Sequence, residues 1–295
     1  MKTKSLLTMA TGSILKNKMR TMLTMLGIVI GVGAVIVMVA VGNGAQKQIE
    51  AQIKNLGTNL IVVTPGSTAA GGASQGAQTF NRLTVADADK IKSDATLLSA
   101  VSPVIVTRTQ IITGKGNWRT EIYGVSTDYL TIRDWGVTSG DLFTDDDVRT
   151  KRKVAVLGAT VVKNLFPDSD PVGSEVQLGH VPFTVVGVLA PKGQTSSGVD
   201  QDDIVLVPYT TAQDRLSGMV FLGQILASAS SPKDMVAAQE EIRGIMRDSH
   251  GLLGGGADDF TVRDQTAIAQ AATSTTSVMS GLLAAIASIS LVVGG

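Results

Sequence analysis

The chain is organised around the apolar segment Thr21–Gly42, TMLTMLGIVIGVGAVIVMVAVG. It is 22 residues long and contains no charged residue and no proline. At about 1.5 Å of rise per residue, a helix of this length measures about 33 Å, enough to cross a hydrocarbon layer of about 30 Å. We therefore expect a transmembrane helix over residues 21–43.

A cleaved signal peptide is the alternative interpretation of this stretch. Its apolar core would be about 7–15 residues long and would end at a small-residue cleavage site. The observed run is longer, and Val39-Ala40-Val41 and Gly42-Asn43-Gly44 are poor cleavage sites. An uncleaved helix fits the sequence better.

The charges flanking the stretch predict its orientation. The first acidic residue is Glu50, and five basic residues precede the run: Lys2, Lys4, Lys16, Lys18 and Arg20. The rest of the chain holds the other 20 basic residues and all 25 acidic ones, a balance of −5. The positive-inside rule then places residues 1–20 in the cytoplasm and the main domain outside. The basic cluster is small and lacks aromatic residues, so we expect no nucleic-acid partner.

Residues 1–20 also have an amphipathic pattern. Leu7, Ala10 and Ile14 share one helical face, which predicts a cytoplasmic helix on the membrane surface. A frayed tail is the alternative.

Features on both sides of Gly42 suggest that the helix packs against others and continues outward. Small residues allow close helix packing, and we assign this role to Gly27, Gly31 and Gly33. Beyond Gly44 an amphipathic helix is expected over residues 47–56. Its apolar positions, which we predict to form a stalk, are Ile49, Ile53 and Leu56.

Two strand–helix–strand segments are expected on either side of a β-rich middle region. In the first, Thr84 is a good N-cap, with Asp87 in the first helical turn. In the last, Pro232 opens a helix that runs to about Asp248. The middle region contains a predicted hairpin across 114–117 and several short strands. A second apolar run, 278–293, predicts the start of a return helix.

The chain offers little for catalysis, cofactors or metals. It has no cysteine, and neither His180 nor His250 has a partner arrangement typical of nucleophilic catalysis. His250 is interpreted as a cation at the end of a helix. The phosphate-binding pattern GxxxxGK[ST] is absent. The two acidic clusters, 145–147 and 200–203, are interpreted as solvated loops or helix caps, so we expect no catalytic, cofactor-binding or metal site.

Several motifs resemble MacB-type transporter permeases of the FtsX-like superfamily, in the family's order. The most specific is the signature segment, Asp200-Gln201-Asp202-Asp203 followed by Val207-Pro208-Tyr209-Thr210-Thr211-Ala212. We assign signature roles to Asp200, Asp202, Asp203, Pro208 and Tyr209. The other matching stretches are NKMRT (17–21), LTMLGI (23–28), IGV (30–32), LGTNLI (56–61), PG (65–66), VAVLG (154–158), LF (165–166), DPVG (170–173), VVGV (185–188) and SLVVGG (290–295).

The resemblance implies an α+β membrane protein with a defined domain order. It predicts a transmembrane helix, an extracytoplasmic domain of two βαβ porter-like halves with a β-rich inserted lobe, and the start of a second transmembrane helix. The boundaries expected on this basis are 1–20 (cytoplasmic helix), 21–43 (first transmembrane helix), 44–113 (first half with stalk), 114–203 (inserted lobe), 204–273 (second half with stalk) and 274–295 (second transmembrane helix).

The resemblance also implies a role. The chain would be a non-catalytic subunit of an ATP-driven efflux transporter in the inner membrane of a bacterium, passing ATPase-driven movement to its outer domain. ATP and Mg would bind a separate ATPase subunit acting near Lys16, Lys18 and Arg20. A second permease copy is expected, and an adaptor protein and an outer-membrane duct are further candidate partners.

The sequence departs from the family pattern at both ends. No ATPase domain precedes the first helix, and the last apolar run stops at Gly295, so we expect a fragment of a longer permease. A membrane-anchored scaffold that recruits a cell-envelope partner without transport is the alternative function. An exported hydrolase is disfavoured because no catalytic constellation is present. The cargo cannot be derived from the sequence.

Overall fold

The computed structural model describes residues 18–56, 59–66, 82–114, 116–195, 198–252, 257–264 and Gly281. The predicted cytoplasmic helix before Lys18, Lys16 included, lies outside these residues, as does the second apolar run apart from Gly281. The chain divides into two compact units. One comprises Met1–Ala51 and Ile268–Gly295, and the other comprises Gln52–Ala267.

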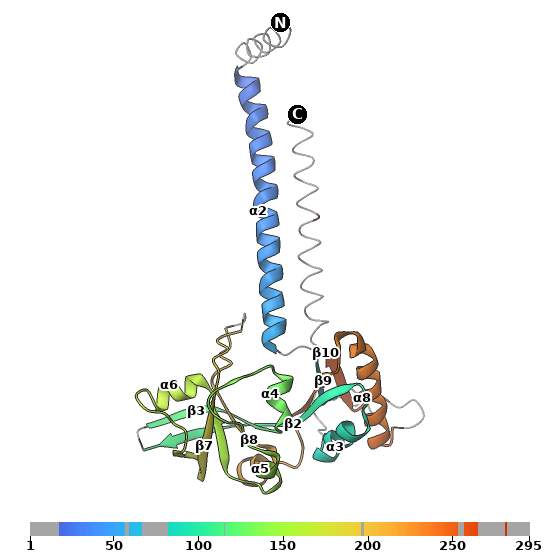
Figure 1. The fold of residues 1–295 in the computed structure, drawn as a ribbon. Helices are drawn as coiled ribbons and strands as arrows, with labels where there is room; N and C mark the ends of the chain where they lie inside the picture. Colours follow the sequence, from blue (N-terminus) through green and yellow to red (C-terminus); the bar gives the residue numbers. More distant parts are fainter. Residues whose placement is uncertain are drawn as a thin grey trace, which may run out of the picture. The chain divides into compact units, whose positions relative to one another are not determined.

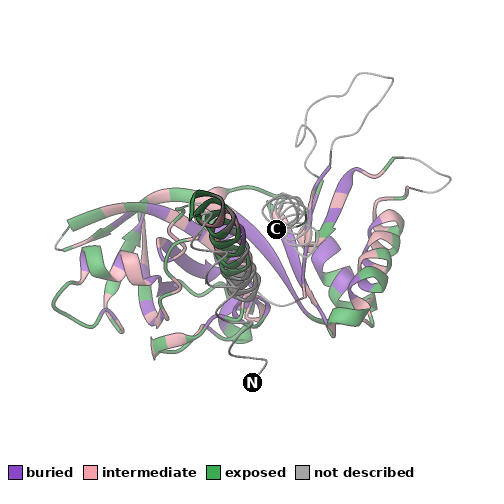
Figure 2. Cartoon of the chain, turned by 90° about the horizontal axis from the view of Figure 1, so that it is seen from above, coloured by how far each residue is buried: buried purple, intermediate pink, exposed green. Residues whose placement is uncertain are grey.

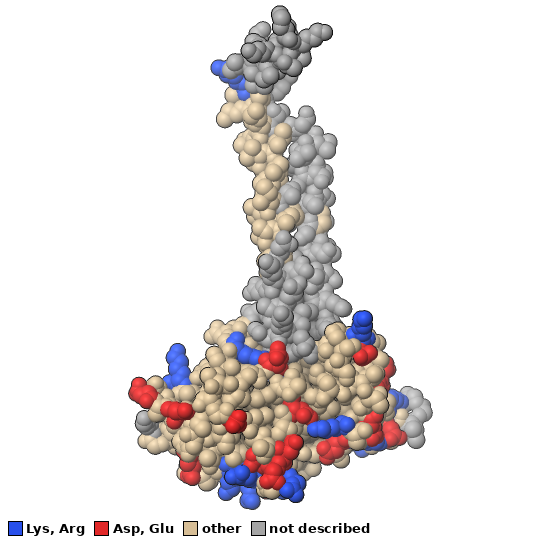
Figure 3. Space-filling model, viewed as in Figure 1, with Lys and Arg blue, Asp and Glu red and all other residues tan. Residues whose placement is uncertain are grey.

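The first unit contains most of helix α2 (Lys18–Leu56), which is 39 residues long. Its candidate membrane span is Thr21–Gly42, with a mean hydropathy of 2.7, which agrees with the expected span. Figure 3 shows no charged side chain along this apolar part. Met22 and Val29 are about two-thirds exposed, at 70% and 67%, unlike the side chains of a buried core helix. The helix continues without a break into the predicted stalk.

The second unit begins with a lobe of four antiparallel strands and two helices, here called the βαβ lobe (Figure 1). Its strands lie in the order β10-β1-β9-β2, the order of a split βαβ motif. Each half runs strand, helix, strand along the chain. The elements are β1 (Leu60–Pro65), α3 (Val85–Asp94), β2 (Leu98–Thr113), β9 (Gln224–Ala229), η2 (Pro232–Asp234), α8 (Met235–Ser249) and β10 (Phe260–Asp264).

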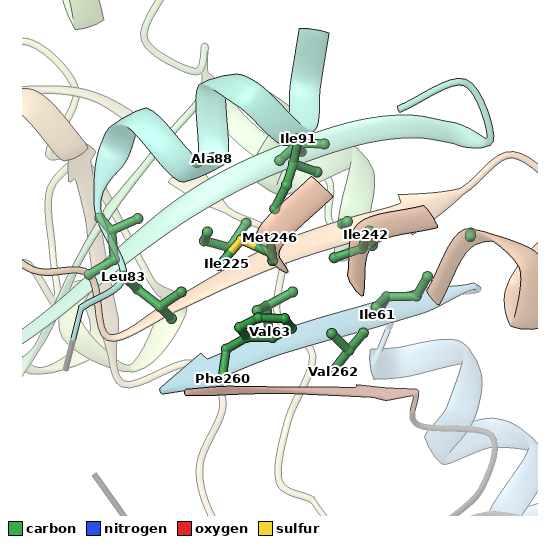
Figure 4. Packing of buried hydrophobic residues seen from close by; sticks show 14 of the residues in the cluster. Ile61, Val63, Leu83, Ala88, Ile91, Ile225, Ile242, Met246, Phe260 and Val262 are labelled. Atoms are coloured by element: carbon green, nitrogen blue, oxygen red, sulfur yellow. The ribbon is translucent and has the colours of Figure 1, made fainter. Parts of the chain in front are cut away.

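Helices α3 and α8 cover one face of this sheet. Strand residues Ile61, Val63 and Ile225 are fully buried against Ile91 and Ile242 of the helices (Figure 4). Alternate residues of β1 point to this face, as the period of a strand requires. Burying each such side chain contributes about 1.5–3 kcal/mol, so this cluster holds the two helices on the sheet.

The second lobe, here called the inserted lobe, lies in the chain between β2 and β9. Its sheet continues from β2 in the order β3-β8-β5-β7-β4, and β6 pairs with β2 and β7. The β3–β8 and β5–β7 pairs are parallel. The elements are β3 (Gly116–Val125), α4 (Asp128–Ile132), β4 (Val137–Gly140), α5 (Asp145–Arg149), β5 (Val154–Leu157), α6 (Ala159–Leu165), β6 (Glu175–Leu178), β7 (Val181–Leu189), β8 (Ile204–Pro208), α7 (Tyr209–Thr211) and the π-helix η1 (Ala212–Ser217).

The position of β8 corrects one expected boundary. The sequence analysis ends the inserted lobe at residue 203 and assigns Ile204–Val207 to the second half. In the structure β8 lies between β3 and β5 within the sheet of the inserted lobe. An apolar run of this kind predicts a buried strand, but it carries no information on which strand it pairs with.

Strand β2 belongs to both lobes. Its first part, Leu98–Val104, pairs with β9, and its second part, Ile105–Thr113, pairs with β3. Pro103, which cannot donate a backbone hydrogen bond, pairs only with Ile225 of β9 and lies just before β3 begins to pair. Figure 2 shows buried residues along this strand, because both of its faces are covered near the switch.

A second hydrophobic cluster joins the two lobes. It combines the far face of the βαβ sheet, through Leu60, Val104 and Leu226, with Tyr129 and Leu206 of the inserted lobe. A third cluster fills the other side of the inserted lobe around Phe183 and Leu157. The lobes therefore share apolar packing as well as a strand.

Capping residues confirm the local predictions. Thr84 forms a capping box with Asp87 at the start of α3. Thr144 and Asp147 form a second box at the start of α5, so the acidic run 145–147 is the first turn of a short helix. Each such cap stabilises its helix by about 1 kcal/mol.

His250 caps the C-terminal end of α8, as expected, and is also buried between two carboxylates. Its Nδ1 lies 2.7 Å from Asp259 Oδ1, and its Nε2 lies 3.3 Å from Asp87 Oδ2. Asp87 also accepts hydrogen bonds from Ser249 and Thr84. The cluster ties α3, α8 and the segment before β10 together.

We expect His250→Ala to lower the free energy of unfolding by about 3 kcal/mol, because the two buried carboxylates lose the imidazole ring that contacts both of them. Denaturant unfolding of the purified chain, followed by circular dichroism, measures this. His180→Ala is the matched control, since His180 is exposed, and should change the free energy by less than about 0.5 kcal/mol. Equal effects of the two substitutions would contradict a structural role for the cluster.

The pKa values of two carboxylates, Glu241 and Asp87, predict that the folded protein loses stability in acid. Burial by itself would raise the pKa of Glu241, but hydrogen bonds from the Thr96 backbone and hydroxyl and from the Leu97 N–H outweigh it and lower the pKa. Burial by itself would likewise raise the pKa of Asp87, but the hydrogen bonds from Ser249 and Thr84 outweigh it, so the pKa of Asp87 is lowered. A carboxyl with a lowered folded pKa contributes stability above its unfolded pKa of about 4 and loses it as the pH falls through the folded value.

The thermal unfolding midpoint should therefore fall as the pH decreases from 5 to 3. Glu241→Gln removes one titrating group, so the fall should be smaller in this variant. Glu240→Gln, one position earlier and outside this set of hydrogen bonds, is the matched control. A pH dependence that is the same in wild type and Glu241→Gln would show that Glu241 does not contribute.

Candidate functional site

The first part of the signature segment, Asp200–Asp203, lies in the connection between β7 and β8, and its second part covers the end of β8 and α7. Asp202 is buried there, and its two carboxylate oxygens accept hydrogen bonds from the backbone N–H groups of Lys192 (2.8 Å) and Gly193 (2.9 Å). One side chain thus joins the start of the connection to its end. Asp202 acts as a structural clamp on this loop.

The same segment is attached to the start of α6. Asp200 accepts a hydrogen bond from the Thr160 hydroxyl at 2.7 Å and another from the Asp202 backbone N–H at 2.9 Å. A Cβ on Gly158 would lie 2.2 Å from the Asp202 carbonyl oxygen, so this approach requires glycine. The VAVLG motif and the signature segment are therefore parts of one contact.

Asp203, Pro208 and Tyr209 have separate surroundings. Asp203 accepts a hydrogen bond from the Trp118 indole N–H at 2.8 Å, which links the segment to β3. Pro208 ends β8 opposite Val125 and precedes the short helix α7. Tyr209 packs against the cluster between the lobes, and burial raises the pKa of its hydroxyl. Pro208 and Tyr209 support the fold.

A cavity of about 260 Å³ lies between the two lobes, beside the signature segment. The βαβ lobe contributes residues from β1 and β9, and the inserted lobe contributes β3, α4 and the segment before β8. The lining residues are Leu60, Val62, Glu121, Tyr123, Tyr129, Arg133, Trp135, Val199, Asp200, Gln201, Asp203, Ile204, Gln224 and Leu226. The structure therefore brings Asp200 and Asp203 to the cavity and leaves Asp202, Pro208 and Tyr209 outside it.

The polar side chains of the cavity wall are held in place. The Tyr123 hydroxyl donates to Glu121 Oε2 at 3.2 Å, and Trp135 Nε1 donates to the Ala190 carbonyl at 2.6 Å. Burial, followed by the charge of Glu121, raises the pKa of Tyr123, and burial raises that of Tyr129. Both hydroxyls are neutral at physiological pH, and that of Tyr123, which donates to Glu121, can still accept a hydrogen bond.

Lys192 lies behind one wall of the cavity. Its ammonium is 5.1 Å from the centre of the Trp135 ring and donates to the Arg133 carbonyl. Burial, followed by repulsion from Arg133, lowers the pKa of Lys192 to about 8. An ammonium on the face of an indole is a cation–π contact.

The sequence analysis did not find Glu121, Tyr123, Tyr129, Arg133 or Trp135 as site residues. They come from β3 and from α4 and the residues after it, and their contact with β1 and β9 depends on pairing far along the chain. The sequence signal that could have pointed to these residues was the clustering of aromatic residues. The chain has two tryptophans and three tyrosines, and four of these five residues fall between 118 and 135.

The remaining predicted positions lie on α2. Lys18 and Arg20 are in its first turn, and Lys18 is exposed. A Cβ added at Gly31 or Gly33 would meet no described heavy atom within 4 Å, and Gly27 is partly exposed. The backbone of Ile49, Ile53 and Leu56 continues the helix. Within the described part of the chain, no three His, Cys, Asp or Glu side chains are placed to hold a metal.

Comparison with known proteins identifies the family. The family model described as "MacB-like periplasmic core domain" matches residues 21–245. "Macrolide export ATP-binding/permease protein MacB" of Syntrophobacter fumaroxidans is 35% identical over 97% of this chain and 48% of its own length. The protein of the same name from Chlorobaculum tepidum is 40% identical over 91% of this chain and 41% of its own length. The chain spans less than half of these relatives.

Solved structures agree on the fold. The periplasmic region of MacB from Actinobacillus actinomycetemcomitans has a TM-score of 0.61 and 23% identity, covering 74% of this chain and 94% of that one. The extracellular domain of the noncanonic ABC-type transporter YknZ from Gram-positive bacteria has a TM-score of 0.56 and 18% identity, covering 70% of this chain and 100% of that one. At these identities the likeness concerns the fold alone. By its family model and its relatives, the chain belongs to the proteins with a MacB-like periplasmic core domain.

Proposed function

We propose that this chain is the membrane and extracytoplasmic part of an ATP-driven export transporter, and that it passes movement from the membrane to its outer domain. Membership of the family and the relatives named as ATP-binding/permease proteins support the general role. The domain then lies outside an inner membrane, with the Thr21–Gly42 helix as its anchor.

The continuity of α2 is the observation that carries the mechanical part of the proposal. At about 1.5 Å per residue its 39 residues measure about 58 Å, so the helix is longer than a membrane core of about 30 Å. Only three residues separate Leu56 from Leu60, where β1 begins. Strand β1 is paired on both sides, with β9 and β10. Movement of α2 would therefore act directly on the interior of a sheet.

The other components of the transporter would be separate proteins. A separate ATP-binding subunit would act on the cytoplasmic border around Lys16, Lys18 and Arg20, and a second copy of the chain would complete the permease. Gly27, Gly31 and Gly33 would allow neighbouring helices to approach. An adaptor and an outer-membrane duct are candidate further partners. Macrolides, which the relatives' name gives as their cargo, are the first compounds to test.

We expect Ile53→Pro to abolish cargo-stimulated ATP hydrolysis in the reconstituted complex. Proline removes a backbone hydrogen bond and kinks a helix at a cost of about 3 kcal/mol, which would uncouple the span from β1. Ile53→Ala keeps the helix and is the matched control. The assay measures phosphate release by proteoliposomes that contain the chain and its ATP-binding subunit, with and without a macrolide.

Full stimulation in the Ile53→Pro variant would contradict transmission through α2. Tryptophan fluorescence of both variants checks that the outer domain remains folded. A chain that forms no complex with an ATP-binding subunit, but retains an envelope protein, would instead support the scaffold function.

A further inference from the structure

The cavity between the lobes has the dimensions of a ligand site. Its volume of about 260 Å³ is close to the lower end of the range of small-molecule pockets, about 300–1,000 Å³. Apolar side chains of β1 and β9, Leu60, Val62 and Leu226, form one side. Most of the other lining residues are polar or charged, so the cavity is more polar than the usual small-molecule pocket.

The charges around the cavity favour a cation. Three carboxylates line it, those of Glu121, Asp200 and Asp203, against one guanidinium, that of Arg133. Glu121 is paired with Arg108 on the neighbouring strand. In the described part of the chain, Asp200 and Asp203 form no ion pair with a lysine or an arginine. With Glu121 paired to Arg108, the two charges of Asp200 and Asp203 exceed the one charge of Arg133, so the lining keeps an excess of one negative charge.

The hydrogen-bonding groups favour a donor. Gln201, which lines the cavity, has a buried side-chain oxygen that receives no hydrogen bond within the described structure. Asp203 uses its Oδ1 for the Trp118 indole, which leaves Oδ2 able to accept another bond. A buried acceptor without a donor costs about 1–3 kcal/mol, so a ligand that supplies N–H groups gains from this arrangement.

Aromatic rings complete the wall. The rings of Tyr123 and Tyr129 lie 6.5 Å apart, and Trp135 follows them around the cavity. The protein already places one ammonium, that of Lys192, on the face of Trp135. Aromatic faces of this kind attract cations through the ring quadrupole.

We propose that this cavity binds a compact organic cation, an ammonium or amidinium group carried on a small apolar body. The charged N–H groups would lie against Asp200, Asp203 and the Gln201 oxygen, and the apolar body against the aromatic wall and β1. The site is a property of the outer domain and is independent of the ATPase coupling proposed above.

Three probes with the same aromatic body test this on the full chain in detergent: phenethylammonium, 2-phenylethanol and phenylacetate. Both tryptophans of the chain report on the site, because Trp135 lines it and Trp118 bonds to Asp203. Tryptophan fluorescence and calorimetric titration should give an affinity for phenethylammonium at least about tenfold higher than for 2-phenylethanol, as one desolvated charge pair would provide. Phenylacetate should bind most weakly.

Asp203→Asn should reduce the affinity for phenethylammonium about tenfold and leave that for 2-phenylethanol unchanged, since the amide oxygen can still accept from Trp118. Asp168→Asn removes the same charge from an exposed position outside the cavity and should have no effect. Equal affinities of the three probes, tighter binding of phenylacetate, or no binding at all would overturn the proposal. The comparison of the three probes on the wild-type chain tests the proposal even if the Asp203→Asn variant does not fold.

Discussion

The extracytoplasmic unit depends on a single strand that serves two sheets. β2 pairs with β9 over Leu98–Val104 and with β3 over Ile105–Thr113, so neither lobe can lose its register on β2 without affecting the other. Side chains of β2 enter the clusters on both of its faces: Val101 and Ile105 pack under α3 and α8, and Val104 packs between the lobes. The two lobes are joined by backbone hydrogen bonds as well as by apolar packing.

This arrangement also explains where the signature segment acts. Asp202 clamps the loop before β8, and Asp200 and Asp203 attach the segment to α6 and β3. These contacts hold it beside β2's neighbours at the seam between the lobes, where the cavity lies. The acidic residues of this motif therefore have different roles. The Asp202 carboxylate holds the loop together, and Asp200 and Asp203 line the cavity.

Local features of this fold could be predicted from the sequence, and long-range ones could not. The apolar helix, the Thr84 cap with Asp87, and a hairpin near 114–117 follow from spacing within about ten residues. The structure confirms all three, with the hairpin turn between Thr113 and Gly116. The position of β8 could not be predicted, because its parallel pairing with β3 joins residues about 80 positions apart. The cavity residues were missed for the same reason. The contact of His250 with Asp87 and Asp259 likewise depends on three elements meeting, although its place at the end of α8 was predicted.

Hydrogen exchange along β2 tests the central claim, that the shared strand makes the two lobes one cooperative body. The measurement follows the amides of Leu98–Thr113 by mass spectrometry on the full chain, at increasing low concentrations of denaturant. If the lobes form one cooperative body, hydrogen-bonded amides on both sides of the Val104–Ile105 junction exchange through the same opening, with one free energy and one dependence on denaturant. Exchange of the Ile105–Thr113 part through a separate, lower-energy opening, while Leu98–Val104 stays protected, would show that the lobes are independent domains.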